Sequence, residues 1–314
     1  MILTEHVDRP TSVEDVLSRI KKQEEDRKTA GQPTIAHSVF HVKHGTRLGS
    51  PGEGPADEDP LYFNRYVLVR VGDAFGACSF EEGAADESVA DYSGRHLLDL
   101  LHPDVPAPVR MAAADAWLAH QQPHRNHPLA RAYSFPTGTP MQRAIARDRG
   151  VLNLLNPQPQ QRIAVVGVVT PMIREMVDSG AHPVLCDRNI DECLGMAVHS
   201  NLEDALVSEG EVDALLVTGM TVVDGSFDRL REFALSRGIP MVVYAQSGSA
   251  IVREFLGAGV TGLHAEHFPF SQFSADKSPC YSYSADAEQH RAGHVGGEDN
   301  VGGHDSAGVG GADD

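Results

Sequence analysis

The chain has 314 residues, of which 41% are hydrophobic and 22% are charged, enough for a sizeable core and for two domains. Its formal net charge of −18 argues against sequence-independent binding to nucleic acid or an anionic membrane surface, because both need clustered Lys and Arg. The sequence shows no membrane-length apolar run, no signal-peptide pattern and no disulfide spacing among its four Cys. We therefore expect a cytoplasmic protein with reduced thiols that binds a small molecule. A homodimer is one of the assemblies that the sequence leaves open.

Residues 1–135 predict a small α+β domain, because a group of strand patterns precedes a group of helix patterns. The first helix starts at a cap on Thr11 or Ser12, since Asp15 lies three residues after Ser12. The strand patterns surround an acidic loop at 50–60 and include a tight Gly-Asp turn. The expected elements are a helix at 11–31, strands within 36–49 and 65–81, and helices at 94–103 and 109–122.

Residues 136–275 predict a Rossmann-like domain with a mainly parallel, doubly wound sheet, because strands and helices alternate. Beyond about residue 276 the apolar content collapses, so a disordered tail rich in Gly, His and Asp is expected over 276–314. The expected strands are 163–169, 182–189, 213–219, 240–246 and 260–266, and the expected helices are 141–155, 170–180, 226–238 and 249–259.

The segment 162–189 is the most informative part of this domain. It resembles half of a nucleoside-binding βαβ unit, in which an acid at the end of the second strand binds the ribose hydroxyls. The phosphate-binding glycines are missing, because Gly167 is followed by Val168, Val169, Thr170 and Pro171. A ligand with a ribose and no phosphate therefore fits better than NAD. Asp187 is the ribose candidate; its alternative role is a helix cap or a partner of Arg188.

The other binding candidates follow the carboxyl ends of the strands, where open parallel sheets bind ligands. Met172 and Met220 are expected to flank adenine or a sulfonium group, which favours S-adenosylmethionine as substrate or cosubstrate. The alternatives are that Asp224 or Ser226 caps a helix and that the 246–249 turn caps the next one. The complete predicted binding set is Gly167, Thr170, Pro171, Met172, Asp187, Arg188, Asn189, Thr218, Gly219, Met220, Thr221, Asp224, Ser247 and Ser249.

Asp115 is the candidate catalytic base of the first domain. It interrupts an otherwise apolar helix, where an ionised acid is costly unless it is paired or faces a polar cleft. Lining an interdomain cleft would raise its pKa into the range of a general base, whereas the alternative is an ion pair with Arg110. Tyr92 and Tyr133 are the other catalytic candidates.

Potential metal ligands occur without a strong spacing signature. Prolines interrupt the first histidine cluster, and the second lies at the end of a short strand. The sequence therefore predicts no specific metal site. The residues considered are His120, His124 and His127, the pair His264 and His267, and the pair Cys186 and Cys193.

Residues 163–189 and 215–230, with the Ala-rich helix 110–119, resemble the two-domain bacterial and archaeal heavy-metal chelation family. The resemblance implies an enolase-N-terminal-like domain followed by a Rossmann-like one, and it covers most of residues 35–270. The chain departs from the family pattern in both domains. The departures are Asp115 in place of Asn, Met220 in place of a small hydroxyl residue, Asp224 and Ser226 in an Asn-Gly-Thr-like turn, and AQSGS in place of a Gly-Pro-Ser-like turn.

Two hypotheses follow. In the first, the chain is an S-adenosylmethionine-dependent lyase or alkyl transferase. It would cleave a carbon–sulfur bond with release of methylthioadenosine, with closure to a small-ring amino acid as one version. Ordinary methyl transfer is disfavoured because the usual G-x-G turn is absent. In the second, which the resemblance implies, the chain binds a heavy metal or metal chelate without catalysis.

Overall fold

The computed structural model describes residues 9–46, 62–273 and 277–285. The acidic loop 50–60 and residues 286–314 of the expected tail lie outside these ranges. The helices are α1 Val13–Thr29, α2 Leu97–Leu100, α3 Ala107–Gln121, α4 Pro140–Leu155, α5 Thr170–Asp178, α6 Leu202–Glu209, α7 Thr221–Asp224, α8 Phe227–Arg237 and α9 Ser249–Arg253, with 3₁₀ turns η1 Glu87–Tyr92, η2 His124–Asn126 and η3 Ser271–Phe273. The strands are β1 Ala36–Thr46, β2 Tyr62–Val71, β3 Ala74–Ser79, β4 Arg131–Phe135, β5 Arg162–Val166, β6 His182–Cys186, β7 Glu192–Cys193, β8 Met196–His199, β9 Ala214–Thr218, β10 Met241–Ala245, β11 Gly262–Ala265 and β12 Ser278–Ser284.

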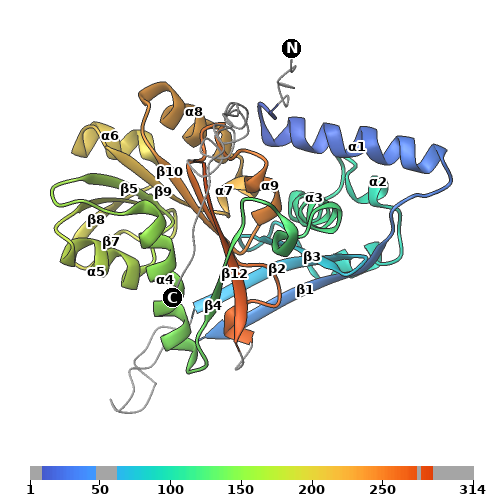
Figure 1. Ribbon diagram of the computed structural model, residues 1–314, viewed down its shortest axis with the longest axis horizontal. Coiled ribbons are helices and arrows are strands. Elements are labelled where there is room, and N and C mark those ends of the chain that lie inside the picture. Colours follow the sequence, from blue (N-terminus) through green and yellow to red (C-terminus); the bar gives the residue numbers. More distant parts are fainter. Residues whose placement is uncertain (1–8, 47–61, 274–276, 286–314) are drawn as a thin grey trace, which may run out of the picture.

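The first domain contains an antiparallel sheet of β1, β2 and β3 (Figure 1). Gly72 and Asp73 form the predicted tight turn between β2 and β3, with Gly72 at φ +54°. Helix α3 packs against β3, and the contact is so close that a Cβ at Gly76 would collide with the main chain of Ala112 and Ala116.

The second sheet has nine strands in the order β4-β12-β11-β10-β9-β5-β6-β8-β7. Six strands, β11 to β8 in that order, are parallel, and β4, β12 and β7 are antiparallel to their neighbours. Alternate residues of β5 pack on opposite faces: Ile163 and Val165 against α4 and α5, and Ala164 in the core with α6 and α8. Helices therefore cover both faces (Figure 1), and the predicted α/β class with a mainly parallel, doubly wound sheet is confirmed.

Two expected boundaries need correction. The predicted tail was to begin at residue 276, but Ser278–Ser284 form β12, which pairs antiparallel with β11 and β4. The segment Arg131–Phe135, assigned to the first domain, forms β4 at the edge of the second sheet. These two strands pair with each other across most of the second domain, so long-range pairing rather than local pattern determines them.

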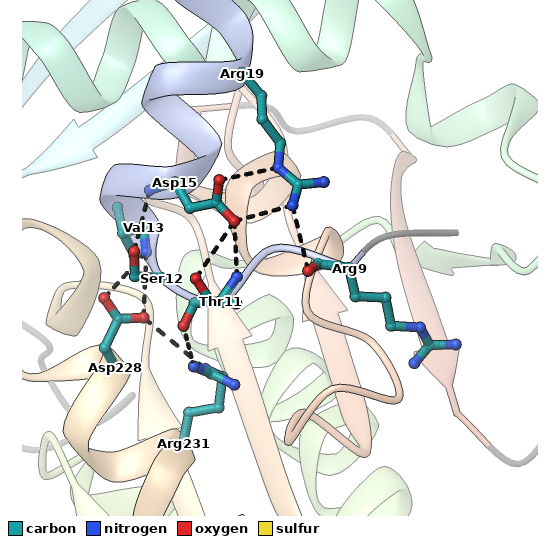
Figure 2. A network of polar contacts seen from close by, with 8 residues as sticks. All are labelled: Arg9, Thr11, Ser12, Val13, Asp15, Arg19, Asp228 and Arg231. Carbon is teal, nitrogen blue, oxygen red and sulfur yellow. Dashed lines mark hydrogen bonds and ion pairs between the residues drawn. The ribbon is translucent and has the colours of Figure 1, made fainter. Parts of the chain in front are cut away.

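The two domains are joined at the start of α1 (Figure 2). Ser12 is the N-cap and accepts a hydrogen bond from the Asp15 main-chain N–H at 3.1 Å, as predicted. The Val13 N–H donates to Asp228 on α8 at 3.0 Å, and Arg231 donates to the Thr11 carbonyl. Within the described residues, no helix is both long and apolar enough to span a membrane.

Candidate functional site

A cavity of about 1670 Å³ opens at the carboxyl ends of the parallel strands. Its walls include the residues that follow β5, β6, β9 and β10, together with β2 and β3 of the first domain. The chain leaves β5 toward β6 and later returns to β9 on the other side of β5, so the cavity lies where the strand order reverses. This is the position at which open α/β sheets bind ligands.

Most of the predicted binding residues line this cavity. The carboxyl ends of parallel strands lie at one edge of the sheet, so turns that are far apart in sequence meet there. Those lining it are Gly167, Thr170, Pro171, Asp187, Arg188, Asn189, Thr218, Gly219, Met220, Thr221, Asp224 and Ser247.

Asp187 is oriented by the main chain. One carboxylate oxygen accepts the Val168 N–H at 3.0 Å, and the other accepts the Asn189 N–H at 2.9 Å. Each carboxylate oxygen has two acceptor positions, so one remains on each for a ligand hydroxyl. The Asp187 main-chain N–H also donates to the His199 carbonyl at 2.9 Å. Arg188 pairs instead with Asp224 at 3.3 Å, so the alternative role of Asp187 as its partner does not apply.

The turn after β5 is poor in donors for a phosphate. Gly167 adopts φ +89°, and a Cβ there would lie 2.7 Å from both the Thr218 methyl and the Tyr244 hydroxyl. The Tyr244 hydroxyl donates to the Gly167 carbonyl at 2.8 Å. Helix α5 then starts at Thr170 with Pro171 in its first turn, and proline has no N–H to offer an anion.

The turn after β9 packs closely on the loop after β10. A Cβ at Gly219 would lie 2.9 Å from that of Ala245 and collide with the Ser247 carbonyl. Gly219 is therefore required by chain packing. Asp224 accepts the Ser226 N–H at 2.8 Å and forms a local turn, while the Ser226 hydroxyl makes no capping bond to α8.

Two predicted binding residues do not line the cavity. Met172 is completely buried in the core beneath α5, because the first turn of that helix directs it toward the sheet. The Ser249 hydroxyl contacts His124 Nε2 at 3.1 Å in a buried cluster. Of the two methionines predicted to flank the ligand, Met220 lies at the cavity wall and Met172 does not.

Asp115 joins the two domains rather than lining the cavity. It is 3% exposed, and its carboxylate accepts the N–H groups of Ala77 on β3 at 3.0 Å and Ala250 on α9 at 2.7 Å. Burial raises its pKa to about 6, and these main-chain hydrogen bonds oppose the shift. Gly248 of the 246–249 turn is the N-cap residue of α9, as in the alternative interpretation of this turn, and Asp115 accepts the Ala250 N–H of the first turn of the helix.

Neither tyrosine candidate lies at the cavity. Tyr92 ends η1, and Arg95 stacks over its ring with 4.9 Å between guanidinium and ring centre. Tyr133 is on β4, and its hydroxyl donates to the Ala146 carbonyl at 3.2 Å. The alternative ion pair of Asp115 with Arg110 is also not formed, because Arg110 lies near Glu14 instead.

Sequence reasoning missed a second polar group at the cavity wall. Arg147 and Asp148 on α4 form an ion pair of 2.8 Å. Gln246 donates to Glu266 at 2.7 Å and accepts from the Tyr66 hydroxyl at 3.1 Å. These residues come from four separate parts of the chain, and adjacent charges on a helix normally indicate a solvated surface. No local pattern marks them.

The His and Cys residues considered as metal ligands do not form a ligand set among the described residues. Both ring nitrogens of His124 have partners, Tyr283 at 2.6 Å and Ser249 at 3.1 Å, and His264 contacts Cys280 at 3.3 Å. Among the residues that the structure describes, no three His, Cys, Asp or Glu side chains are grouped to hold a metal ion. The described residues therefore do not fit a heavy-metal centre.

Comparison with known proteins finds a family similarity in the second domain. No curated protein matches the chain. Among solved structures, a DUF364 protein of unknown function from Pyrococcus horikoshii has 17% identity and a TM-score of 0.49, covering 85% of this chain and 98% of its own. A DUF364 protein of unknown function from Desulfitobacterium hafniense DCB-2 has 17% identity and a TM-score of 0.48, with 78% and 86% covered. The family model for DUF364, described as "Putative heavy-metal chelation", matches residues 150–261. Residues 150–261 therefore match the DUF364 family, and the predicted resemblance is confirmed for this part of the chain.

Proposed function

We propose that the chain is an enzyme acting on S-adenosylmethionine or a related nucleoside thioether bound in this cavity. The observation that carries the proposal is Asp187. Its carboxylate lies at the cavity wall after β6, fixed by two main-chain N–H groups, with one acceptor position left on each oxygen. Two adjacent ribose hydroxyls are the donor pair that matches this arrangement.

The neighbouring turn supports a ligand without phosphate. Gly167 is the one glycine of this turn, and Pro171 removes a donor from the start of α5. A dinucleotide would need these main-chain donors for its pyrophosphate. A nucleoside joined to an uncharged thioether or a sulfonium group does not.

Met220 supports the thioether assignment. It lines the cavity at the start of α7, beside the turn after β9. A polarisable thioether packs well against an adenine face or a methyl group. Arg188 is held by Asp224, so the charge on this side of the cavity is neutralised within the protein.

The proposed chemistry is cleavage of a carbon–sulfur bond rather than methyl transfer. The electron pair of the broken bond stays on sulfur, and neutral methylthioadenosine leaves. The released carbon forms a bond to a nucleophile. In the cyclisation version this is the α-amino nitrogen of the same molecule, which loses a proton to a base and closes a small ring.

A thermal-shift comparison tests binding. S-adenosylhomocysteine and methylthioadenosine at about 100 times their Kd should raise the Tm by roughly 5 °C or more, since ligand binding to the folded state adds about 2.7 kcal/mol. NAD should give no shift. Stabilisation by divalent metals alone, reversed by a chelator, would replace the enzyme with the metal-binding function that the family description names.

Product analysis tests the reaction itself. Purified protein incubated with S-adenosylmethionine should release methylthioadenosine above the rate of the protein-free control. Accumulation of S-adenosylhomocysteine instead would identify a methyltransferase and contradict the proposed bond cleavage.

A further inference from the structure

The cavity wall contains a buried carboxylate oxygen that no described residue hydrogen-bonds. Asp148 is 1% exposed and lines the cavity. Its Oδ1 accepts from Arg147 Nε and Nη2, at 3.0 and 2.8 Å, whereas Oδ2 has no hydrogen-bond partner among the described residues. Burial raises the pKa of Asp148, and Arg147 lowers it. A buried acceptor of this kind is costly unless a ligand donates to it.

Glu266, the neighbouring buried carboxylate, provides a contrast. One of its oxygens accepts the Ser271 N–H, and the other accepts from Gln246 at 2.7 Å. Gln246 is held in turn by Tyr66 and donates to Gln272 at 3.0 Å. Glu266 is therefore satisfied within the protein, whereas Asp148, which also lines the cavity, has one buried carboxylate oxygen that no described residue satisfies.

Arg147 retains donors beside this oxygen. A guanidinium group has five N–H donors, and the pair with Asp148 accounts for two of them. Its side chain is 23% exposed and lines the same cavity. A carboxylate acceptor and spare guanidinium donors thus lie side by side, and this pair of charges complements a zwitterion.

Tyr244 lies near both groups of polar residues at the cavity wall. Its hydroxyl donates to the Gly167 carbonyl, in the turn whose Val168 N–H holds Asp187. Burial raises the Tyr244 pKa, and the carboxylates of Asp148 and Asp187 both raise it further. The Tyr244 hydroxyl therefore lies within electrostatic range of both carboxylates, and both line the same cavity.

We propose that Arg147 and Asp148 bind the α-amino acid group of the ligand, with its ammonium on Asp148 Oδ2 and its carboxylate on the guanidinium of Arg147. This inference rests on the proposed function and specifies it further. The cavity would select nucleosides that carry an amino acid at the sulfur end over nucleosides that lack one.

The test measures the Kd of S-adenosylhomocysteine, which carries the amino acid, and of methylthioadenosine, which lacks it. The unaltered protein should bind S-adenosylhomocysteine at least tenfold more tightly. Asp148→Asn should weaken its binding about tenfold and change the Kd of methylthioadenosine less than twofold. Glu175→Gln is the matched control, because Glu175 also lines the cavity but is 43% exposed and pairs with Arg149; neither Kd should change.

A ligand variant keeps the test independent of folding. The analogue of S-adenosylhomocysteine with hydrogen in place of its α-amino group should bind the unaltered protein about tenfold more weakly than the parent compound. Equal affinities of the two compounds, or equal affinities of S-adenosylhomocysteine and methylthioadenosine, would overturn the subsite while leaving nucleoside binding intact. Failure of both nucleosides to bind would overturn the proposed function and this inference together.

Discussion

Asp115 lies on an apolar helix, and its carboxylate connects the two domains. An acid on an apolar helix is costly, and here the cost is offset by main-chain N–H groups from two other elements, β3 and α9. The sequence identified Asp115 as unusual. It could not show that both domains supply its partners, because these lie 38 and 135 residues away.

Asp115 should make stability depend on pH. Its pKa is about 6 in the folded protein, above the ordinary 3.8, so the folded state keeps a proton that the unfolded chain has released. The free energy of unfolding should therefore fall as pH rises from about 4 to about 6, by roughly 3 kcal/mol from this group. Urea unfolding of the unaltered protein and Asp115→Asn should show a difference that changes over this range. A pH-independent difference would contradict the assignment.

Gly219→Ala should destabilise the protein through a collision of Cβ with the Ser247 carbonyl and Ala245. Overpacking of this kind costs about 1–3 kcal/mol. Gly225→Ala is the control, since Gly225 has φ +78° and nothing within 4 Å of a Cβ, so it carries only the left-handed backbone cost of about 1 kcal/mol. Thermal unfolding compares them, and equal losses would show that the close approach at Gly219 is unimportant.

Helix α1 depends on another element for its N-terminus. Ser12 satisfies the Asp15 N–H, and Asp228 of α8 satisfies the Val13 N–H (Figure 2). A helix start normally leaves its first N–H groups unpaired, so two caps from different domains fix where α1 lies.

Asp228→Ala should therefore lower the free energy of unfolding by about 1–2 kcal/mol and accelerate amide hydrogen exchange in residues 13–20. Arg229→Ala on the same helix, whose side chain is 69% exposed, should have little effect on either quantity. Unchanged exchange in Asp228→Ala would mean that Ser12 alone secures the start of α1.

At the scale of the whole molecule, the alternation of strand and helix patterns predicted the parallel part of the sheet. The prediction succeeded because the local residue pattern of these segments agrees with their burial in the fold. The predicted ends of β5, β6 and β9 brought Asp187, Thr218 and Gly219 to one cavity for the same reason. The strands β4 and β12 were missed, since they pair with each other across more than 140 residues. Asp148 was not predicted as a site residue, because the residue pattern of α4 does not show which other parts of the chain bury its side chain.

The central claim is that Asp187 binds the ribose of a nucleoside. Calorimetric titration with methylthioadenosine tests it most directly, because this ligand lacks the amino acid that the second subsite would bind. Asp187→Asn should raise the Kd at least tenfold, since one charge-assisted hydrogen bond corresponds to about 1.5–3 kcal/mol. Asp191→Ala, which removes an exposed acid of the same loop that does not line the cavity, should leave the Kd unchanged. An unchanged Kd in Asp187→Asn would contradict the account.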